Sequence, residues 1–489
     1  MDAASDRALD PRRWRGLFVL LLGQFCALLD VSVTNVALPS IGRATGAGPA
    51  ELQWVVSGYI LAFALMPVIA GRLGDTRGRR RIFLVGITGF IIASAAVGLS
   101  PVPLVMIAAR VIQGMFGGLL GPQVSGYIQN TFPRVERGRA FGGLGATVGV
   151  GTALGPVLGG ILIGLGGPDF GWRLVFFINI PIGITAIVLA LLWVKDPGPV
   201  VDRATVRLDV GGALLLGSAV LCVLFPIVEV NEFHSAWLFL LFLPAALLVY
   251  LFLRRESRLS REGGSPLLDL RLFRIPTFTT GVSFAVVFFC SNTGIPLVLS
   301  LYYQQGLGFT ALESGLGVSA FALGSVLGAT VAGRLVSRLG RPLVVGAVSL
   351  FFLATLTIEL VAHLSADVTS PVEVILRLAA PLFLLGVAGG SIVTPNQTLT
   401  LMDVDPREGG TAGGVLQTAQ RVGSATGQTV LGTLFFVSVA GLTASQSLRA
   451  PAAHPADFAA ALDAGLIGSL VFSGVALALG IVDLRRTRR

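Results

Sequence analysis

Long apolar stretches follow one another along almost the whole chain, each separated from the next by a short segment that carries charge, proline or glycine. A helix needs about 20 apolar residues to cross the hydrocarbon core of a bilayer. Fourteen stretches of this kind can be recognised from their hydrophobic pattern. They lie near residues 17–38, 52–71, 82–100, 103–122, 140–164, 172–194, 209–228, 236–253, 278–301, 312–333, 342–362, 374–397, 412–438 and 465–483. We therefore expect an all-α polytopic membrane protein with fourteen transmembrane helices.

Composition supports a membrane protein and excludes an ordinary soluble one. Hydrophobic residues make up 54% of the chain and charged residues only 12%, whereas about a quarter of a soluble protein is charged. The first apolar stretch continues to full spanning length without a small-residue cleavage site, so we expect no cleaved signal peptide. Cys26, Cys222 and Cys290 lie inside apolar stretches, which indicates neither a disulfide framework nor a metal site.

Positive charge alternates from loop to loop. The formal net charge is +9, and 29 of the 35 Lys and Arg residues fall on alternate loops, beginning with the N-terminal segment. Positive residues in short loops favour the cytoplasm, so both termini are predicted to be cytoplasmic. A nucleic-acid binder would gather its charge on one soluble face, and no nucleic-acid partner is expected. The abundance of Ala, Gly and Arg, with Lys195 the single lysine, fits a GC-rich bacterial genome and hence a bacterial cytoplasmic (inner) membrane.

An internal repeat predicts the architecture. The segment Gly71–Arg79 recurs loosely as Gly333–Arg341, and Gly151–Gly155 is echoed by Gly423–Gly427. Both pairs are eight spans apart, so we expect two six-helix bundles in the same orientation with two inserted helices between them. Parallel six-helix halves place a substrate site at their interface near the middle of the bilayer. The predicted divisions are 1–194, 195–260 and 261–489.

Four motifs occur in an order that resembles the major facilitator superfamily and, within it, the fourteen-helix drug:proton antiporters. They are Leu29–Pro39 in the first span, Gly71–Arg81 after the second, Arg110–Gly114 in the fourth and Gly151–Gly160 in the fifth. The resemblance covers essentially the whole chain. It implies a major facilitator fold and alternating-access export of hydrophobic small molecules, such as drugs or antibiotics, in exchange for protons. We expect a monomer in the lipid bilayer that needs no cofactor and no metal.

Asp30 is a carboxylate in the middle or outer half of an otherwise apolar helix. A charge in hydrocarbon is expensive, so this acid should face water, find a partner or take up a proton. Desolvation strengthens proton binding by a carboxylate and a nearby arginine weakens it. The resemblance assigns Arg110 to proton coupling beside this acid. The alternative is a fixed ion pair, or for Arg110 a simple tether between helices.

The segment after the second span predicts a conformational latch formed by Gly71, Asp75 and Arg79. Its glycines permit a tight turn, and Asp75 can meet a helix N-terminus or the surrounding arginines. Gly74 and Thr76 replace the alanine and arginine of the common family pattern. The alternative is an exposed charged turn that only sets the topology.

The fifth span carries the segment that resembles the antiporter motif, Gly151, Gly155, Pro156 and Gly159. Small residues four apart allow another helix to approach closely. Proline removes a backbone hydrogen bond and permits a kink. The resemblance favours export by antiport over uptake by symport.

Other side chains within the spans are candidates for substrate binding. Each of the polar ones could equally serve as a hydrogen bond between helices, and the aromatic ones could pack in the core or face lipid. The candidates are Thr34, Tyr59, Phe63, Gln113, Asn292, Asn396 and Gln417, with Gln397, Gln420 and Arg421 as further polar residues. Ser57 stands where relatives that export cations can carry a second acid, which disfavours divalent cations as substrates.

Three alternatives to a drug exporter can be compared with the sequence. A dedicated exporter of one endogenous metabolite, peptide or lipid would have the same architecture. A membrane-embedded enzyme would need a cluster of nucleophile, base or metal ligands at depth, and the sequence carries no such cluster and no phosphate-binding loop; we therefore expect no enzymatic activity. A passive channel or receptor would not explain the repeat together with the four motifs.

Glu313 follows Thr310 at the spacing of a capping box, so it is expected to cap a helix.

Overall fold

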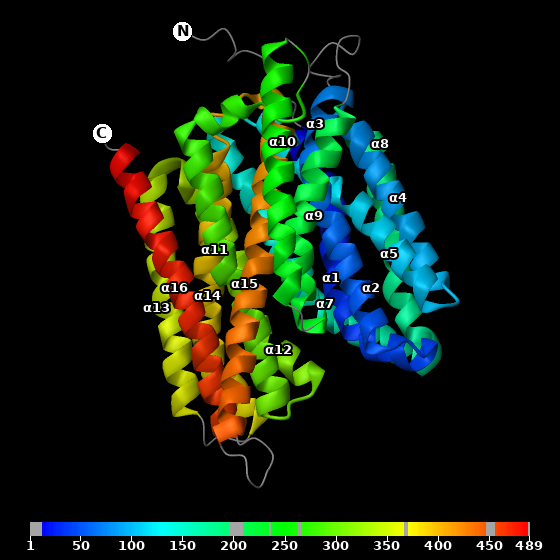
Figure 1. Ribbon diagram of the computed structural model, residues 1–489, viewed down its shortest axis with the longest axis vertical. Coiled ribbons are helices and arrows are strands. Elements are labelled where there is room, and N and C mark those ends of the chain that lie inside the picture. The colour runs from blue at the N-terminus through cyan, green and yellow to red at the C-terminus, as the bar shows by residue number, and fades with distance from the viewer. Residues whose placement is uncertain are drawn as a thin grey trace.

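The computed structural model describes residues 12–194, 209–233, 236–262, 264, 266–365, 370–445 and 455–487. None of these residues belongs to a β-strand. The elements are α1 (Arg13–Thr45), α2 (Pro49–Leu65), α3 (Pro67–Arg77), α4 (Arg79–Leu99), α5 (Pro103–Gly118), α6 (Leu120–Thr131), α7 (Arg134–Phe177), α8 (Asn179–Trp193), α9 (Val210–Phe233), η1 (Ala236–Leu241), α10 (Phe242–Arg261), η2 (Leu270–Arg274), α11 (Pro276–Leu301), η3 (Tyr302–Gly306), α12 (Ala311–Leu339), α13 (Arg341–Leu364), α14 (Pro371–Thr400), η4 (Pro406–Glu408), α15 (Gly409–Ser445) and α16 (Pro455–Thr487). The long helices run side by side along one axis (Figure 1).

The number of spans agrees with the sequence. Among the described residues, 13 helices are long and apolar enough to cross a membrane, or up to 14 if α2 and α3, which are bent by 45°, count as one span. The bend falls at Pro67, which cannot continue the hydrogen-bond ladder of α2. α7 joins two spans across a break at Gly167, whose φ of 72° suits a residue without a Cβ. Thr310 and Glu313 form the expected capping box at the start of α12.

The prediction of a loop after the second span was wrong for the segment Gly71–Arg77, which is helical. The motif Gly71–Arg77 is the C-terminal part of α3, and only Gly78, with φ 97°, lies between α3 and α4. The glycines of the motif are therefore helical, and their use is to allow close packing. The charged residues that interrupt the hydrophobic pattern continue the helix beyond the apolar stretch.

The helices can be grouped by their order in the chain. We call α1–α8 the N-terminal group and α11–α16 the C-terminal group. The helices α9 and α10 pack on each other, and α9 also contacts α2 and α15. The Thr429 hydroxyl of α15 donates to the Ile227 carbonyl of α9 over 2.6 Å, and the rings of Trp54 and Phe225 lie 6.0 Å apart. The inserted pair thus lies beside the junction of α2 with α15.

An ion pair joins the ends of the two inserted helices. Asp209 accepts from the Gly212 amide over 3.0 Å and pairs with Arg255 over 2.7 Å. Burial opposes the ionised form, but the hydrogen bonds from Arg255 and Gly212 outweigh it, so the pKa of Asp209 lies below its usual range. The start of α9 is therefore fixed to the end of α10.

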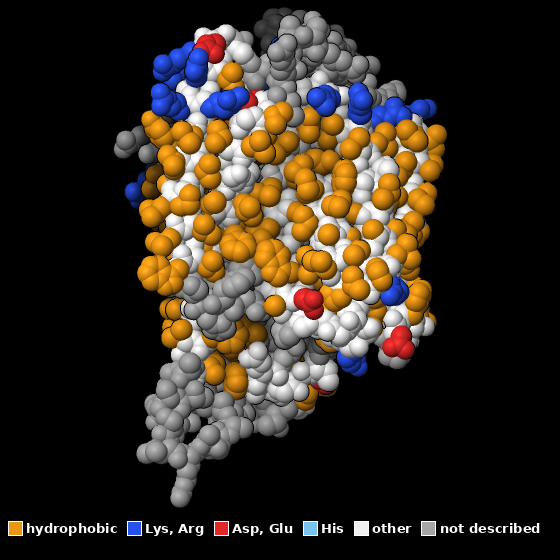
Figure 2. Space-filling view, turned by 45° about the vertical axis from the view of Figure 1, so that its right-hand side comes forward, with side chains coloured by type: hydrophobic (Ala, Val, Ile, Leu, Met, Phe, Trp, Pro, Cys, Tyr) orange, Lys and Arg blue, Asp and Glu red, His pale blue; other side chains and the backbone are white. Residues whose placement is uncertain are grey.

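Arginines and apolar side chains separate along the long axis. Figure 2 shows Lys and Arg gathered at one end, above a broad band of hydrophobic side chains. We call this end, where α3 meets α4 (Arg77–Arg81) and α12 meets α13 (Arg338–Arg341), the basic end. Large apolar residues of the long helices are well exposed, for example Ile92 of α4 at 64% and Leu104 of α5 at 75%, as expected for a surface that faces lipid.

The two groups pack together toward the basic end. One continuous apolar core contains Leu120 of α6 together with Leu401 and Ala412 from the C-terminal side. Along α7 and α12, Gly138 packs against Gly333. The basic end is therefore closed in this structure.

Candidate functional site

Asp30 lies inside the N-terminal group with 1% of its surface exposed. Three side chains from two other helices donate to its carboxylate. Arg110 of α5 forms an ion pair with Oδ2, the Gln113 amide donates to Oδ1 over 2.9 Å, and the Asn179 amide of α8 donates to Oδ1 over 2.7 Å. The charge is thus fully enclosed and compensated, as a buried charge must be.

Arg110 is as deeply buried as the acid and has all its neighbours within the same group. Its Nε donates to the Val55 carbonyl of α2 over 2.9 Å, and its Nη1 donates to Gln113 Oε1 over 2.9 Å. The guanidinium carbon lies 4.2 Å from the centre of the Tyr59 ring. An arginine can serve all these partners because its planar group carries five N–H donors. Arg110 thus connects α5 to α1 through the ion pair with Asp30, and connects α5 to α2 through the Val55 carbonyl and the Tyr59 ring.

Asn179 is a partner of Asp30 that the sequence did not reveal as a site residue. Its amide also donates to the Ser94 hydroxyl over 3.0 Å, and its Oδ1 accepts from the Cys26 thiol over 3.4 Å. Asn179 is fully buried. It is the first residue of α8. Together with Trp172, Arg173, Phe177 and Pro181 it forms a pattern that resembles the family's sixth-span entrance, which indicates its place in the fold and not a contact with Asp30.

The aromatic candidates of α2 form one stack. Tyr59 donates its hydroxyl to the Ala27 carbonyl over 3.2 Å, and its ring lies 5.8 Å from that of Phe63. Both are buried, with Tyr59 1% and Phe63 6% exposed. Thr34 is also buried and donates to the Asp30 carbonyl over 2.6 Å. In this conformation, Thr34 and Tyr59 are therefore hydrogen-bonded to the backbone of α1.

The candidates of the C-terminal group do not gather in one place. Asn396 donates to the Gly281 carbonyl over 3.2 Å and borders a small cavity beside the Arg341–Asp483 ion pair. Asn292 lies against Gly389, and its Oδ1 is buried without a donor. Gln417 reaches the other group. Its amide donates to the Ser125 hydroxyl of α6 over 3.3 Å.

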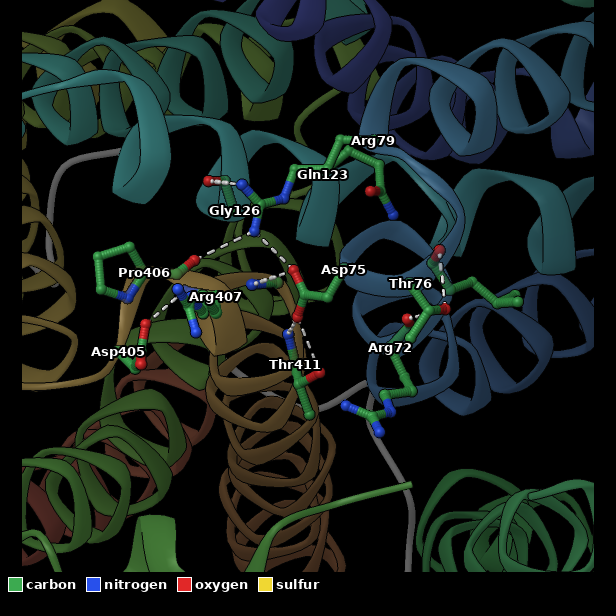
Figure 3. A network of polar contacts seen from close by, with 12 residues as sticks. Arg72, Asp75, Thr76, Arg79, Gln123, Gly126, Asp405, Pro406, Arg407 and Thr411 are labelled. Atoms are coloured by element: carbon green, nitrogen blue, oxygen red, sulfur yellow. Dashed lines mark hydrogen bonds and ion pairs between the residues drawn. The ribbon is translucent and has the colours of Figure 1, made fainter. Parts of the chain in front are cut away.

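Asp75 connects the two groups at the basic end (Figure 3). Its Oδ1 accepts from Arg79 over 2.6 Å and from the Gly410 amide over 3.2 Å. Its Oδ2 accepts from the Thr411 amide over 2.8 Å and from the Thr411 hydroxyl over 3.0 Å. Because Gly410 and Thr411 lie in the first turn of α15, the carboxylate also meets the positive end of that helix.

Arg79 extends the same network across the groups. It donates to the Gly126 carbonyl of α6 and, over 3.3 Å, to the Pro406 carbonyl that precedes α15. Gln129 adds a 3.0 Å hydrogen bond to the Leu401 carbonyl. Gly71 makes the approach possible, because a Cβ there would lie 2.2 Å from the Gly410 carbonyl oxygen.

The glycines of the antiporter motif face α1. A Cβ on Gly155 would lie 2.2 Å from Ser32 Oγ, and one on Gly159 would lie 3.3 Å from Val33, while Gly151 lies against Leu28. The motif therefore packs α7 against the segment of α1 that carries Asp30. Pro156 lies within α7 at the same level.

Comparisons with known proteins agree with this architecture. Residues 20–428 match the family model described as Major Facilitator Superfamily. The chain is 37% identical to the probable actinorhodin transporter of Streptomyces coelicolor, over 89% of this chain and 74% of that protein. It is 33% identical to the puromycin resistance protein pur8 of Streptomyces alboniger, over 99% and 92% of the two chains. The crystal structure of the human organic anion transporter MFSD10 superposes with a TM-score of 0.64 at 16% identity, over 94% and 100%, and shows the fold alone.

Proposed function

This chain belongs to the Major Facilitator Superfamily, and we propose that it exports hydrophobic small molecules across a bacterial cytoplasmic membrane in exchange for protons. It is a multi-pass membrane transporter, not an enzyme. The observation that carries the proposal is the enclosed pair of Asp30 and Arg110 in the N-terminal group. Relatives named for the transport of, or resistance to, antibiotics support a drug-like substrate.

Protonation of Asp30 would change what holds α1 and α5 together. A neutral acid no longer balances the charge of Arg110 in a low dielectric. The remaining contacts of Arg110 outside α5 include the Val55 carbonyl and the Tyr59 ring, both on α2. Proton uptake therefore weakens the tie to α1 and leaves the tie to α2. Since α2 continues through the bend into α3, the change reaches the helix that carries Asp75.

We propose that the contact of Asp75 with α15 is the latch of this cycle. Residues 1–194 and 261–489 would be the two moving bodies, with 195–260 supplying the inserted helices. With the basic end toward the cytoplasm, as the arginine distribution predicts, the closed basic end corresponds to an outward-facing conformation. The membrane potential would then drive proton entry, with about 2.3 kcal/mol per charge at 100 mV.

The test is efflux from cells or proteoliposomes carrying Asp30→Asn, measured with a panel of chemically varied drugs. We expect uphill efflux to fall to the level of vesicles without the protein, while the amount of folded protein is retained. Asp169→Asn, at an exposed aspartate where the second span of α7 begins, is the matched control and should be unchanged. Uphill efflux by Asp30→Asn at the normal rate would contradict the proposal.

A dedicated exporter of one metabolite is the second candidate. The names of the two relatives each give a single compound, which favours a narrow substrate range. The same panel separates the two functions, because a drug exporter would transport several unrelated compounds and a dedicated exporter would transport one chemical type.

A further inference from the structure

A second arginine, Arg421, lies deep in the membrane region. It is 12 residues after the start of α15, which places it about 18 Å along the helix in a hydrocarbon layer about 30 Å thick. Its guanidinium carbon lies 4.7 Å from the centre of the Phe63 ring on α2. In the part of the chain that the structure describes, no carboxylate or other hydrogen-bond acceptor pairs with its side chain.

The absence of an ion-pair partner for Arg421 among the described residues needs a physical explanation. Arginine stays protonated at any working pH, and an uncompensated charge at this depth is expensive and marks a functional site by default. Arg110 shows how the same chain compensates a buried arginine with its own acid. Asp30 is already occupied by that pairing. The charges of these three residues therefore sum to one positive charge, which an anion from outside the chain can balance.

The surroundings of Arg421 combine aromatic and amide side chains. The Phe63 ring, 6% exposed, lies against the Arg421 guanidinium and 5.8 Å from the Tyr59 ring. The amide oxygens of Gln417, one turn away on α15, and Gln24 of α1 both approach Gly121. Within the described residues, Gln24 Oε1 is buried without a hydrogen-bond donor. Arg421 itself keeps a partly accessible surface.

We propose that Arg421 binds the ionised acidic group of a hydrophobic substrate, a carboxylate or a phenolate, at the junction of α2 and α15. This inference rests on the proposed transport function only in treating the junction of α2 and α15 as the place of the substrate. Phe63 and Arg421 belong to different groups, so the ligand contacts both bodies that must move. The site selects for negative charge, and its recognition residue is separate from the proton-coupling acid.

The test measures binding to the full-length protein in lipid nanodiscs at neutral pH, without any gradient. The probes are 9-anthracenecarboxylate and the neutral 9-anthracenecarboxamide, which share one ring system. Wild type should bind the carboxylate about tenfold more tightly than the carboxamide, as expected for hydrogen bonds to a charged group. Arg421→Gln should weaken carboxylate binding about tenfold and leave carboxamide binding unchanged, and Arg421→Lys should retain part of the preference.

Arg377→Gln, at an exposed arginine of α14 that pairs with Glu373, is the matched control and should bind like wild type. The inference is overturned if wild type binds both probes equally or neither, or if Arg421→Gln weakens both to the same extent, since that would indicate a structural role. Because no proton gradient is present, a charge preference without proton-driven efflux would overturn the proposed function alone. Proton-driven efflux without the preference would overturn this inference alone.

Discussion

The two groups of helices hold their buried charges differently. In the N-terminal group each of two acids has its own arginine, Asp30 with Arg110 and Asp75 with Arg79. In the C-terminal group, Arg421 has no acid within the described residues. Under the proposed function, the N-terminal group would bind and release the proton, and the C-terminal group would supply a positive charge for the substrate.

The repeated motif shows the same asymmetry at the basic end. Gly71 lies against the Gly410 carbonyl, and its counterpart Gly333 lies against the Gly138 carbonyl, so the close approach of helices occurs twice. Asp75 corresponds to Ser337 in the repeat, and the carboxylate that reaches a helix N-terminus occurs once. The repeat keeps the close packing of helices, and of these two contacts only that of α3 with α15 includes a carboxylate, Asp75.

Of the contacts at the basic end, the one made by Asp75 should contribute most to keeping that end closed. Asp75→Asn removes the negative charge that accepts from Arg79 and from the start of α15, and hydrogen bonds to charged groups contribute about 1.5–3 kcal/mol each. We expect the population with an open basic end to rise about 30-fold. The measurement is the distance distribution between spin labels at exposed positions, Arg77→Cys and Arg407→Cys, in a cysteine-free background. Ser337→Ala is the matched control, and an equal effect of both would remove the distinction between the two contacts.

The close contacts at Gly71 and at Gly333 should contribute equally to keeping the basic end closed. Gly71→Ala would place a Cβ 2.2 Å from the Gly410 carbonyl oxygen, and Gly333→Ala would place one 2.6 Å from that of Gly138. Overpacking of this kind costs about 1–3 kcal/mol, so each variant should open the basic end about tenfold in the same spin-label assay. Gly160→Ala, where a Cβ meets nothing within 4 Å, should have no effect. A response from only one of the two glycines would show that the packing is not equivalent.

The smallest effect is expected at Asn179. Asn179→Ala removes one hydrogen bond from a neutral amide to the ionised Asp30 and leaves the arginine pair in place, which corresponds to the low end of the range for bonds to charged groups, about 1.5 kcal/mol. Proton-driven efflux should fall up to about tenfold without being abolished. Ser94→Ala, which removes the other acceptor of the Asn179 amide, should cost less. Complete loss in Asn179→Ala would give this amide a role equal to that of the arginine.

The sequence predicted the number of spans because helices in a bilayer must be long and apolar. It also placed Asp30 and Arg110 in one site, through the family resemblance. It did not predict Asn179, because an uncharged amide 149 residues away from the acid has no distinguishing pattern. Nor did it reveal that Gly71–Arg77 is helical, since charge and glycine are typical of loops.

The sequence also did not predict which residues of the two groups contact each other. Gly410 and Thr411 donate to Asp75 through backbone amides, which every residue except proline carries, and the Thr411 hydroxyl adds one more hydrogen bond. The isolation of Arg421 depends on which helices surround it. Such pairings arise only when the two groups are packed together.

Proton release on ligand binding tests the central claim most directly. The purified protein, in weakly buffered solution, is mixed with a compound that it transports, and the protons released are counted for wild type and Asp30→Asn. The account predicts that wild type releases protons and that Asp30→Asn binds the compound without releasing any. Equal proton release from both proteins, or binding to wild type with no release, would contradict it.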